Sequence, residues 1–310
     1  MKYLFIAALI SLIPLQIAFA QGCSDAGFCT MGAMRPDQPY NKKINLKLRS
    51  MELSYYEGNT PVSPTIRVVT ADFNFGITDK MAFQIKVPYH MVKGSFAQTS
   101  GMGDLSLCLT RNIFNSEKFD INFSLGSKIP SNNSDLEQDG KPLPMYYQTS
   151  LGTYDFISGI SLINRKWLFA TGIQHPFNRN NNQFTWDTWP NYHDQNYVRR
   201  NSEALELKRG TDIMLRVERN FRLSKVNFTT GLLPIYRITH DEITDKDTGD
   251  RVKVPETTGL ALSIINSVGY NLNVKSGFKA MYGHALVQRN RNPDGLTRDN
   301  VFTLSYYYRF

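Results

Sequence analysis

The sequence predicts an all-β fold class, a transmembrane antiparallel up-and-down β-barrel of about twelve strands over residues 44–310. Three observations support this prediction. Apolar and polar residues alternate in segments of roughly ten residues, the length of a tilted transmembrane strand. Short turns and longer polar loops alternate between these segments. Beyond residues 1–20, no apolar run approaches the roughly 20 residues that a membrane helix needs.

Residues 1–20 have the pattern of a secretory signal peptide, and we exclude them from the fold. Lys2 gives a positive start, 3–17 is mostly apolar, and Ala18 and Ala20 flank Phe19 as a small-x-small cleavage site. The alternative is lipidation at Cys23, because a small residue precedes it, although Ala20 stands where a lipoprotein would usually show Leu.

Residues 21–43 precede the first strand and are too few for a domain. We expect a periplasmic segment or a small plug inside the barrel. Cys23 and Cys29 predict a local disulfide, because the protein is exported. The alternatives are a link from a plug to Cys108, which we expect to point inward, and a metal site of all three cysteines. No His-rich spacing supports a metal, and we predict no metal and no cofactor.

The first six strands follow from apolar residues at alternate positions. The first covers 44–56, and its apolar phase shifts near Arg49 and Ser50, which indicates a β-bulge. The next five have apolar faces that include Phe73, Phe83, Leu107, Phe123 and Phe156, and they lie near 66–76, 81–92, 104–110, 119–125 and 150–163.

The other six strands continue the alternation near 167–176, 212–218, 226–236, 258–270, 274–287 and 301–310. Short turns such as 164–166 and 271–273 join neighbouring strands. Longer loops are expected near 57–64, 93–102, 131–148, 177–209, 240–256 and 288–299.

The barrel has to be closed, because every backbone N–H and C=O in lipid must be paired inside the protein. We expect the short turns and both termini in the periplasm and the long loops outside the cell. A soluble β-sandwich is the alternative, but its strands are usually shorter and it rarely needs six polar loops on one side.

The last strand carries apolar residues at every second position, namely Phe302, Leu304, Tyr306, Tyr308 and Phe310. This ending resembles the signal by which Gram-negative outer-membrane barrels are recognised for insertion. The resemblance implies the cell outer membrane as the location, and the barrel-assembly machinery as a partner through Phe310.

The net charge of +8 raises the possibility of nucleic-acid binding. Export and the absence of a compact Lys/Arg run argue against nucleic acid. We expect contacts with outer-membrane lipid and lipopolysaccharide, whose head groups are anionic, and a mildly cationic lumen.

The candidate functional residues lie on the polar faces of the strands and in the longest loop. We expect five residues to line the lumen: Lys86, Asp104, Asp120, Arg216 and Glu218. They predict either a polar path for a small solute, with anions favoured, or a salt-bridged filled interior. Trp186, Trp189 and Tyr192 in 177–209 are expected to gate the mouth, and the alternative is a self-packed loop.

Loop 240–256 is acidic, and five of its side chains could hold Ca²⁺: Asp241, Glu242, Asp245, Asp247 and Asp250. A solvated loop is the preferred interpretation, because the EF-hand pattern is incomplete.

We predict no enzyme and no catalytic residue, since no GxSxG or HExxH motif is present. A barrel-type lipid hydrolase is a less favoured alternative to a channel, as is a non-transporting barrel that acts as a scaffold in an envelope complex.

Gly101, Gly103, Asp104 and Leu105 begin an alternating strand after a long loop. This motif resembles one in a family of Gram-negative putative transporters annotated with a MetA pathway of phenol degradation. The resemblance implies an uptake or channel function, with small apolar or aromatic compounds as substrates. The segment that contains Cys23 and Cys29 does not match that family, so the substrate stays open.

Overall fold

The computed structural model describes residues 46–62 and 64–310. The predicted signal peptide, the segment 21–43, the Cys23–Cys29 disulfide and lipidation at Cys23 lie outside the described residues. The barrel strands are β1 (Lys47–Asn59), β2 (Thr65–Thr78), β3 (Met81–Lys93), β5 (Leu105–Asn115), β6 (Asp120–Ile129), β9 (Asp155–Ile163), β10 (Trp167–Pro176), β11 (Asp212–Leu223), β12 (Val226–Arg237), β15 (Gly259–Asn271), β16 (Ser276–Val287) and β17 (Asn300–Arg309).

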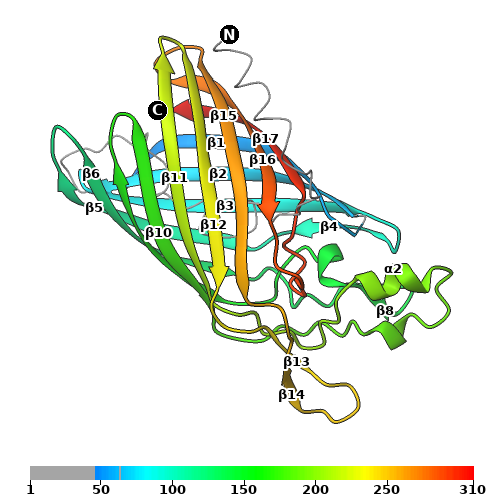
Figure 1. The fold of residues 1–310 in the computed structure, drawn as a ribbon. Coiled ribbons are helices and arrows are strands. Elements are labelled where there is room, and N and C mark those ends of the chain that lie inside the picture. Colours follow the sequence, from blue (N-terminus) through cyan, green and yellow to red (C-terminus); the bar gives the residue numbers. More distant parts are fainter. Residues whose placement is uncertain (1–45, 63) are drawn as a thin grey trace, which may run out of the picture.

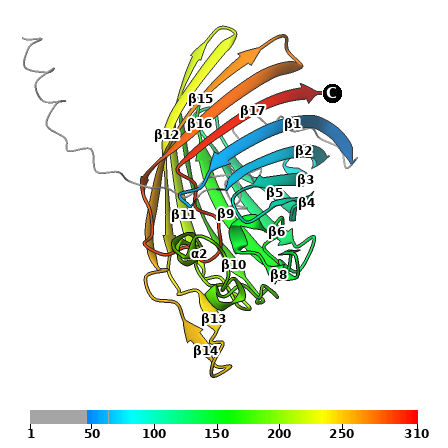
Figure 2. The same ribbon diagram turned by 90° about the vertical axis from the view of Figure 1, so that its right-hand side faces the viewer.

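These twelve strands form a closed antiparallel barrel in which each strand pairs with its neighbour in the sequence (Figure 1). The last strand closes the ring on the first, with Ser50 opposite Arg309 and Asn59 opposite Asn300 (Figure 2). Closure leaves no open sheet edge in the spanning region, as a bilayer requires. The predicted fold class is therefore confirmed.

The connections differ at the two ends of the barrel. Tight hairpin turns join the strands at one end, where the chain also finishes at Phe310. Longer loops at the other end hold the small elements β4 (Gln98–Met102), β7 (Glu137–Gln138), β8 (Lys141–Pro142), η3 (Met145–Tyr147), η4 (Trp186–Thr188), α2 (Gln195–Arg200), β13 (Glu242–Thr244) and β14 (Arg251–Lys253) (Figure 1). No helix in the described ranges has the length and apolar character needed to cross a membrane.

The outer face of the barrel is apolar. Phe123 and Leu215 are 37% and 44% exposed, and large apolar side chains continue this surface on every side, including Leu53, Phe169, Leu232, Leu260, Phe278 and Leu304. Such a surface would be unfavourable in water but suits a hydrocarbon environment. The chain is thus a membrane-spanning barrel of the outer-membrane type, with its short turns on the periplasmic side.

One detail of the strands agrees with the predictions and two differ from them. The β-bulge expected near Arg49 is present, because the β1–β2 register shifts between Leu48 and Ser50. The loop expected at 93–102 contains β4, which folds back on the upper part of β3. The strand expected at 150–163 begins only at Asp155, since 150–153 belongs to a buried segment folded into the barrel.

Candidate functional site

The connection from β6 to β9 enters the barrel from the extracellular end. All eleven residues of 143–153, here called the inner loop, are buried. A buried loop must satisfy its own polar groups. The Gln148 side chain does so locally: its amide nitrogen donates to the carbonyls of Leu136 and Leu143, and its oxygen accepts from the Leu136 N–H. The inner loop is therefore a packed element of the lumen.

Asp104, from the Gly-x-Gly-Asp motif, anchors the inner loop to the barrel wall. Its buried carboxylate accepts the backbone N–H of Leu151 at 3.2 and 3.3 Å and lies 3.7 Å from Lys128 Nζ. The two glycines of the motif allow close packing: a Cβ at Gly103 would lie only 2.4 Å from the His90 ring, and one at Gly101 would lie 3.3 Å from Thr149 Oγ1 of the inner loop. The motif thus positions a loop, a role that the sequence did not predict.

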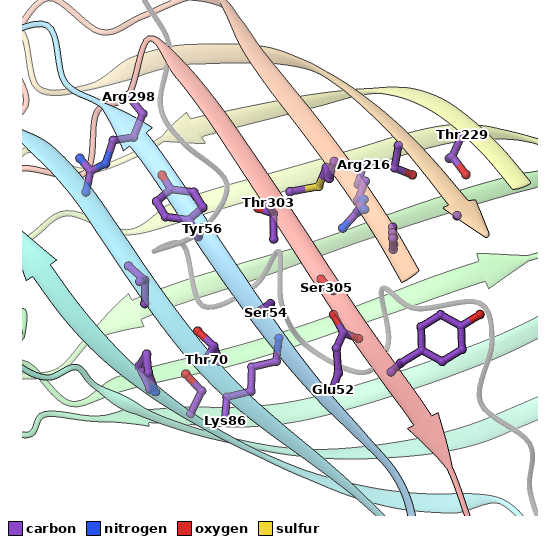
Figure 3. Close-up of a pocket in the computed structure, with 18 of the residues that line it drawn as sticks. Glu52, Ser54, Tyr56, Thr70, Lys86, Arg216, Thr229, Arg298, Thr303 and Ser305 are labelled. Carbon is purple, nitrogen blue, oxygen red and sulfur yellow. The ribbon is translucent and has the colours of Figure 1, made fainter. Parts of the chain in front are cut away.

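A cavity of about 460 Å³ occupies the lumen below the inner loop. It reaches from the short-turn end, where Arg222, Asn271 and Tyr307 border it, to a ceiling that includes Tyr146, Leu151 and Leu296. Figure 3 shows side chains from several strands directed into this space, with Lys86 and Arg216 coming from strands far apart in the barrel.

Four of the five residues expected in the lumen border this cavity: Lys86, Asp104, Arg216 and Glu218. Most of these charged side chains form ion pairs with other side chains of the barrel wall. Lys86 Nζ lies 3.3 Å from Asp72, and Arg216 lies 2.5 Å from Glu218. Asp120 is not among the bordering residues, because it lies beside the periplasmic turn and accepts a hydrogen bond from Asn115.

The residues that border the cavity carry a surplus of positive charge. Among the described residues that border it, seven are Lys or Arg and four are Asp or Glu: Lys86, Lys128, Arg216, Arg222, Lys279, Arg298 and Arg309 against Glu52, Asp104, Glu218 and Asp294. Arg222, Lys279 and Arg309 lie at its periplasmic end, so this end of the cavity is cationic. A charged, low-dielectric passage of this kind concentrates ions of the opposite sign.

One stretch of the inner wall is apolar, whereas the lumen-lining residues were expected on the polar faces of the strands. A buried cluster spans β5 to β15 and consists of Cys108, Ile157, Ile163, Leu168, Ala170, Met214, Leu233, Ile235 and Ile265. Cys108 Sγ lies 3.6 Å from Thr110 Oγ1. The lumen therefore combines a charged wall with an apolar one.

Aromatic side chains from three loops form a cluster at the extracellular mouth, which we call the aromatic cap. Its members are Phe96, Tyr147, Phe184, Trp189, Tyr192 and Tyr197. The ring centroid of Phe96 lies 4.5 Å from Trp189, 4.8 Å from Tyr192 and 4.9 Å from Tyr197. The Tyr147 and Tyr197 hydroxyls are 2.6 Å apart, and burial, together with this hydrogen bond, raises the pKa of Tyr147.

The three residues expected to gate the mouth have different positions. Trp189 is buried in the aromatic cap, and its indole N–H donates to the carbonyl of Pro142 at 2.7 Å. Tyr192 is at the edge of the cap and donates to the carbonyl of Ser95. Trp186 is half-buried and binds Asn201 within its own loop. The first two donate hydrogen bonds to neighbouring loops, whereas the indole N–H of Trp186 donates within its own loop.

A buried network of charges fixes two further loops to the rim. Arg237 contacts the carboxylates of Asp212, Asp241 and Asp294 at 2.8–2.9 Å. Burial would raise the pKa of Asp294, but attraction to Arg237 and Arg289 outweighs it and lowers this pKa to about 2. For Asp241 burial dominates and raises the pKa.

The acidic loop forms the exposed hairpin β13–β14. Asp245 Oδ1 accepts the backbone N–H groups of Asp247 and Thr248, and these hydrogen bonds lower the pKa of Asp245. In the two described ranges no group of three or more His, Cys, Asp or Glu side chains is arranged to hold a metal ion.

Solved structures with the same fold are outer-membrane barrels. The COG4313 outer membrane channel from Pseudomonas putida F1 has a TM-score of 0.60 and 13% identity over 88% of this chain and all of that one. NanC porin matches at a TM-score of 0.49 with 7% identity, over 84% of this chain and all of that one. The outer membrane phospholipase A from Escherichia coli matches at 0.37 with 7% identity, over 85% of this chain and 98% of that one.

At such identities the likeness to the COG4313 channel establishes the fold alone. No protein-family model and no curated protein matches the sequence. The chain is an outer-membrane β-barrel, and its location in the outer membrane follows from the closed sheet and the apolar outer face. The resemblance of 101–105 to the phenol-degradation family stays a prediction.

Proposed function

We propose that this chain is an outer-membrane channel for the passive passage of small solutes, with a preference for anions. The observation that carries the proposal is the lumen cavity, which reaches from the periplasmic end to the inner loop and is bordered by more cations than carboxylates. The charged side chains of the wall keep the path polar, and the cations Arg222, Lys279 and Arg309 lie at its periplasmic end.

The aromatic cap and the inner loop lie between this cavity and the cell exterior. Passage therefore requires the cap to move, and Trp189 and Tyr192 act in our proposal as gate residues because they connect separate loops. Small aromatic compounds are the second solute class. Two observations favour this class. Apolar side chains such as Ile66, Val68 and Met281 border the cavity, and residues 101–105 resemble the motif of the phenol-degradation family.

The test is the reversal potential of the folded, full-length mature protein in planar bilayers under a KCl gradient. We expect anion selectivity in the parent and a shift toward cations in the triple variant R222E/K279E/R309E. Lys253→Glu on the exposed hairpin β14 is the matched control and should leave the potential unchanged. Cation selectivity in the parent, or a triple variant identical to the parent, would contradict the proposal.

A closed cap would hide conduction, so the same measurement includes Trp189→Ala. This variant removes the hydrogen bond to Pro142 and the contact with Phe96, and we expect it to open more often than the parent. If the parent and W189A both fold and neither conducts, the scaffold alternative is favoured.

A further inference from the structure

Arg219 is a cation on the lipid-facing side of the barrel wall. Successive side chains of a strand point to opposite faces. On β11 the even-numbered Arg216, Glu218 and Asn220 border the lumen cavity, so Arg219 lies on the same face as the exposed Leu215. An Arg on this face is costly at the bilayer midplane and nearly neutral at the interface. Its place near the periplasmic turns makes it an interfacial residue.

Two exposed aromatic rings flank this guanidinium. Arg219 Cζ lies 5.0 Å from the ring centroid of Trp167 and 5.4 Å from that of Phe221. Trp167 is the register partner of Arg219 on β10. The two rings are 39% and 43% exposed, and Trp167 lies at the rim, where it borders both the lumen and the outer face. Cation–π contacts hold the guanidinium at the depth where barrels place their aromatic girdles.

Two further cations precede this position in the sequence. Arg165 and Lys166 are exposed in the turn that leads into Trp167, and the backbone N–H of Asn220 donates to the carbonyl of Lys166 at 2.7 Å. This bond keeps the turn beside Arg219. Among residues 46–62 and 64–310, none of the three cations has a carboxylate within ion-pair distance. The adjacent acid, Glu218, points into the lumen and binds Arg216.

We propose that Arg165, Lys166 and Arg219 form a binding site for the phosphate of an anionic glycerophospholipid in the periplasmic leaflet. A guanidinium pairs well with phosphate oxygens, and basic clusters at a membrane surface attract anionic lipids. The flanking rings of Trp167 and Phe221 contact the glycerol and upper acyl chain. Phospholipid is chosen over lipopolysaccharide because the site lies at the short-turn end, opposite the extracellular loops. The site does not depend on conduction through the lumen.

The test is native mass spectrometry of the delipidated, folded protein titrated with phosphatidylglycerol, phosphatidylethanolamine or lipid A. We expect the parent to bind phosphatidylglycerol most tightly. Each charge removed should weaken that binding about fivefold, and R165Q/K166Q/R219Q about a hundredfold. Arg67→Gln is the matched control, because Arg67 also faces outward but lies at the extracellular end, paired with Glu57. It should bind phosphatidylglycerol as the parent does.

Three results would overturn the site: a triple variant that keeps the parental affinity, a parent that binds phosphatidylethanolamine as tightly as phosphatidylglycerol, and a parent that prefers lipid A. Folding of each variant is checked by its shift on unheated gels. If the triple variant does not fold, Arg219→Lys and Arg219→Met replace it. R219K should keep most of the affinity and R219M should lose about fivefold, and equal affinity of the two variants would also refute the site.

Discussion

Arg237, the last residue of β12, and Asp294, in the loop before β17, lie 2.9 Å apart, and both side chains are completely buried. Asp212 and Asp241 contact the same guanidinium. One side chain of the barrel wall therefore holds carboxylates from two extracellular loops and from the start of β11. The shape of the rim depends on this one residue, and its energetics lead to the first two predictions.

Replacing Arg237 by Met leaves buried carboxylates without their main partner. We expect Arg237→Met to lower the free energy of unfolding by about 3–5 kcal/mol, because uncompensated buried charge is strongly unfavourable. Urea unfolding in detergent micelles, followed by tryptophan fluorescence, measures this. Arg67→Met removes an exposed partner of Glu57 and should cost less than about 1 kcal/mol. Similar losses in the two variants would contradict the assignment.

Asp294 gives the rim a defined pH dependence. Its pKa falls on folding from 3.8 to about 2, so its ionised form stabilises the fold above pH 3.8, and this contribution disappears as the pH falls through about 2. We expect Asp294→Asn to cost about 2 kcal/mol at pH 7, and the difference from the parent to shrink toward zero near pH 2. Unfolding curves between pH 2 and pH 7 test this.

Asp241 contacts the same Arg237, but burial raises its pKa. A carboxyl with a raised pKa loses stabilisation as the pH rises through that pKa, so its charge contributes less at neutral pH. We therefore expect Asp241→Asn to cost less than Asp294→Asn at pH 7. A larger loss of stability at pH 7 for Asp241→Asn than for Asp294→Asn would contradict this assignment of the two carboxylates.

The Tyr147 hydroxyl connects two of the extracellular loops. It accepts the backbone N–H of Phe96 at 3.1 Å and shares a hydrogen bond with Tyr197. Tyr147→Phe leaves a buried N–H without an acceptor, which costs about 1–3 kcal/mol. We expect faster proteolysis within 177–209 and more frequent channel opening. Tyr154→Phe, at an exposed position, is the control and should change neither.

The orientation of β11 gives a direct test of the lipid-facing surface. Leu215→Arg places a charge against hydrocarbon and should destabilise the folded protein by about 2–4 kcal/mol. Thr229→Arg adds the same charge to the lumen, where Thr229 borders the cavity, and should alter ion selectivity with a smaller loss of stability. Folding titrations in lipid vesicles compare the two. If T229R were the more damaging variant, the assignment of faces would be wrong.

The alternation of apolar residues was enough to predict the barrel, because each strand alone specifies which face meets lipid. Phe123 and Leu215 carry that information in their own sequence neighbourhoods. Contacts within loops could not be predicted in this way. Asp104 has its partner, Leu151, in a different connection, and Arg237 gathers Asp241 and Asp294 from two loops. No local sequence pattern predicts such contacts between separate loops.

Sequence reasoning also failed where the inner wall departs from simple alternation. Ile157 and Leu233 are apolar and point inward, so the strands that contain them are apolar on both faces. The alternating pattern is weak there, and for this reason the predicted start of the sixth strand, at 150, is too early. The inner loop added to the error, because its buried apolar residue Leu151 resembles a strand residue.

The inner loop also constrains the order in which the chain can be assembled. Backbone atoms of Met145 and Tyr146 lie within 3 Å of the Cβ position at Gly295, in the connection that leads into β17. Once β17 has zipped onto β1, the ring offers little room for a bulky segment to thread inside. We therefore expect the inner loop to take its place while the ring is still open, so that closure of the wall and packing of its interior occur together.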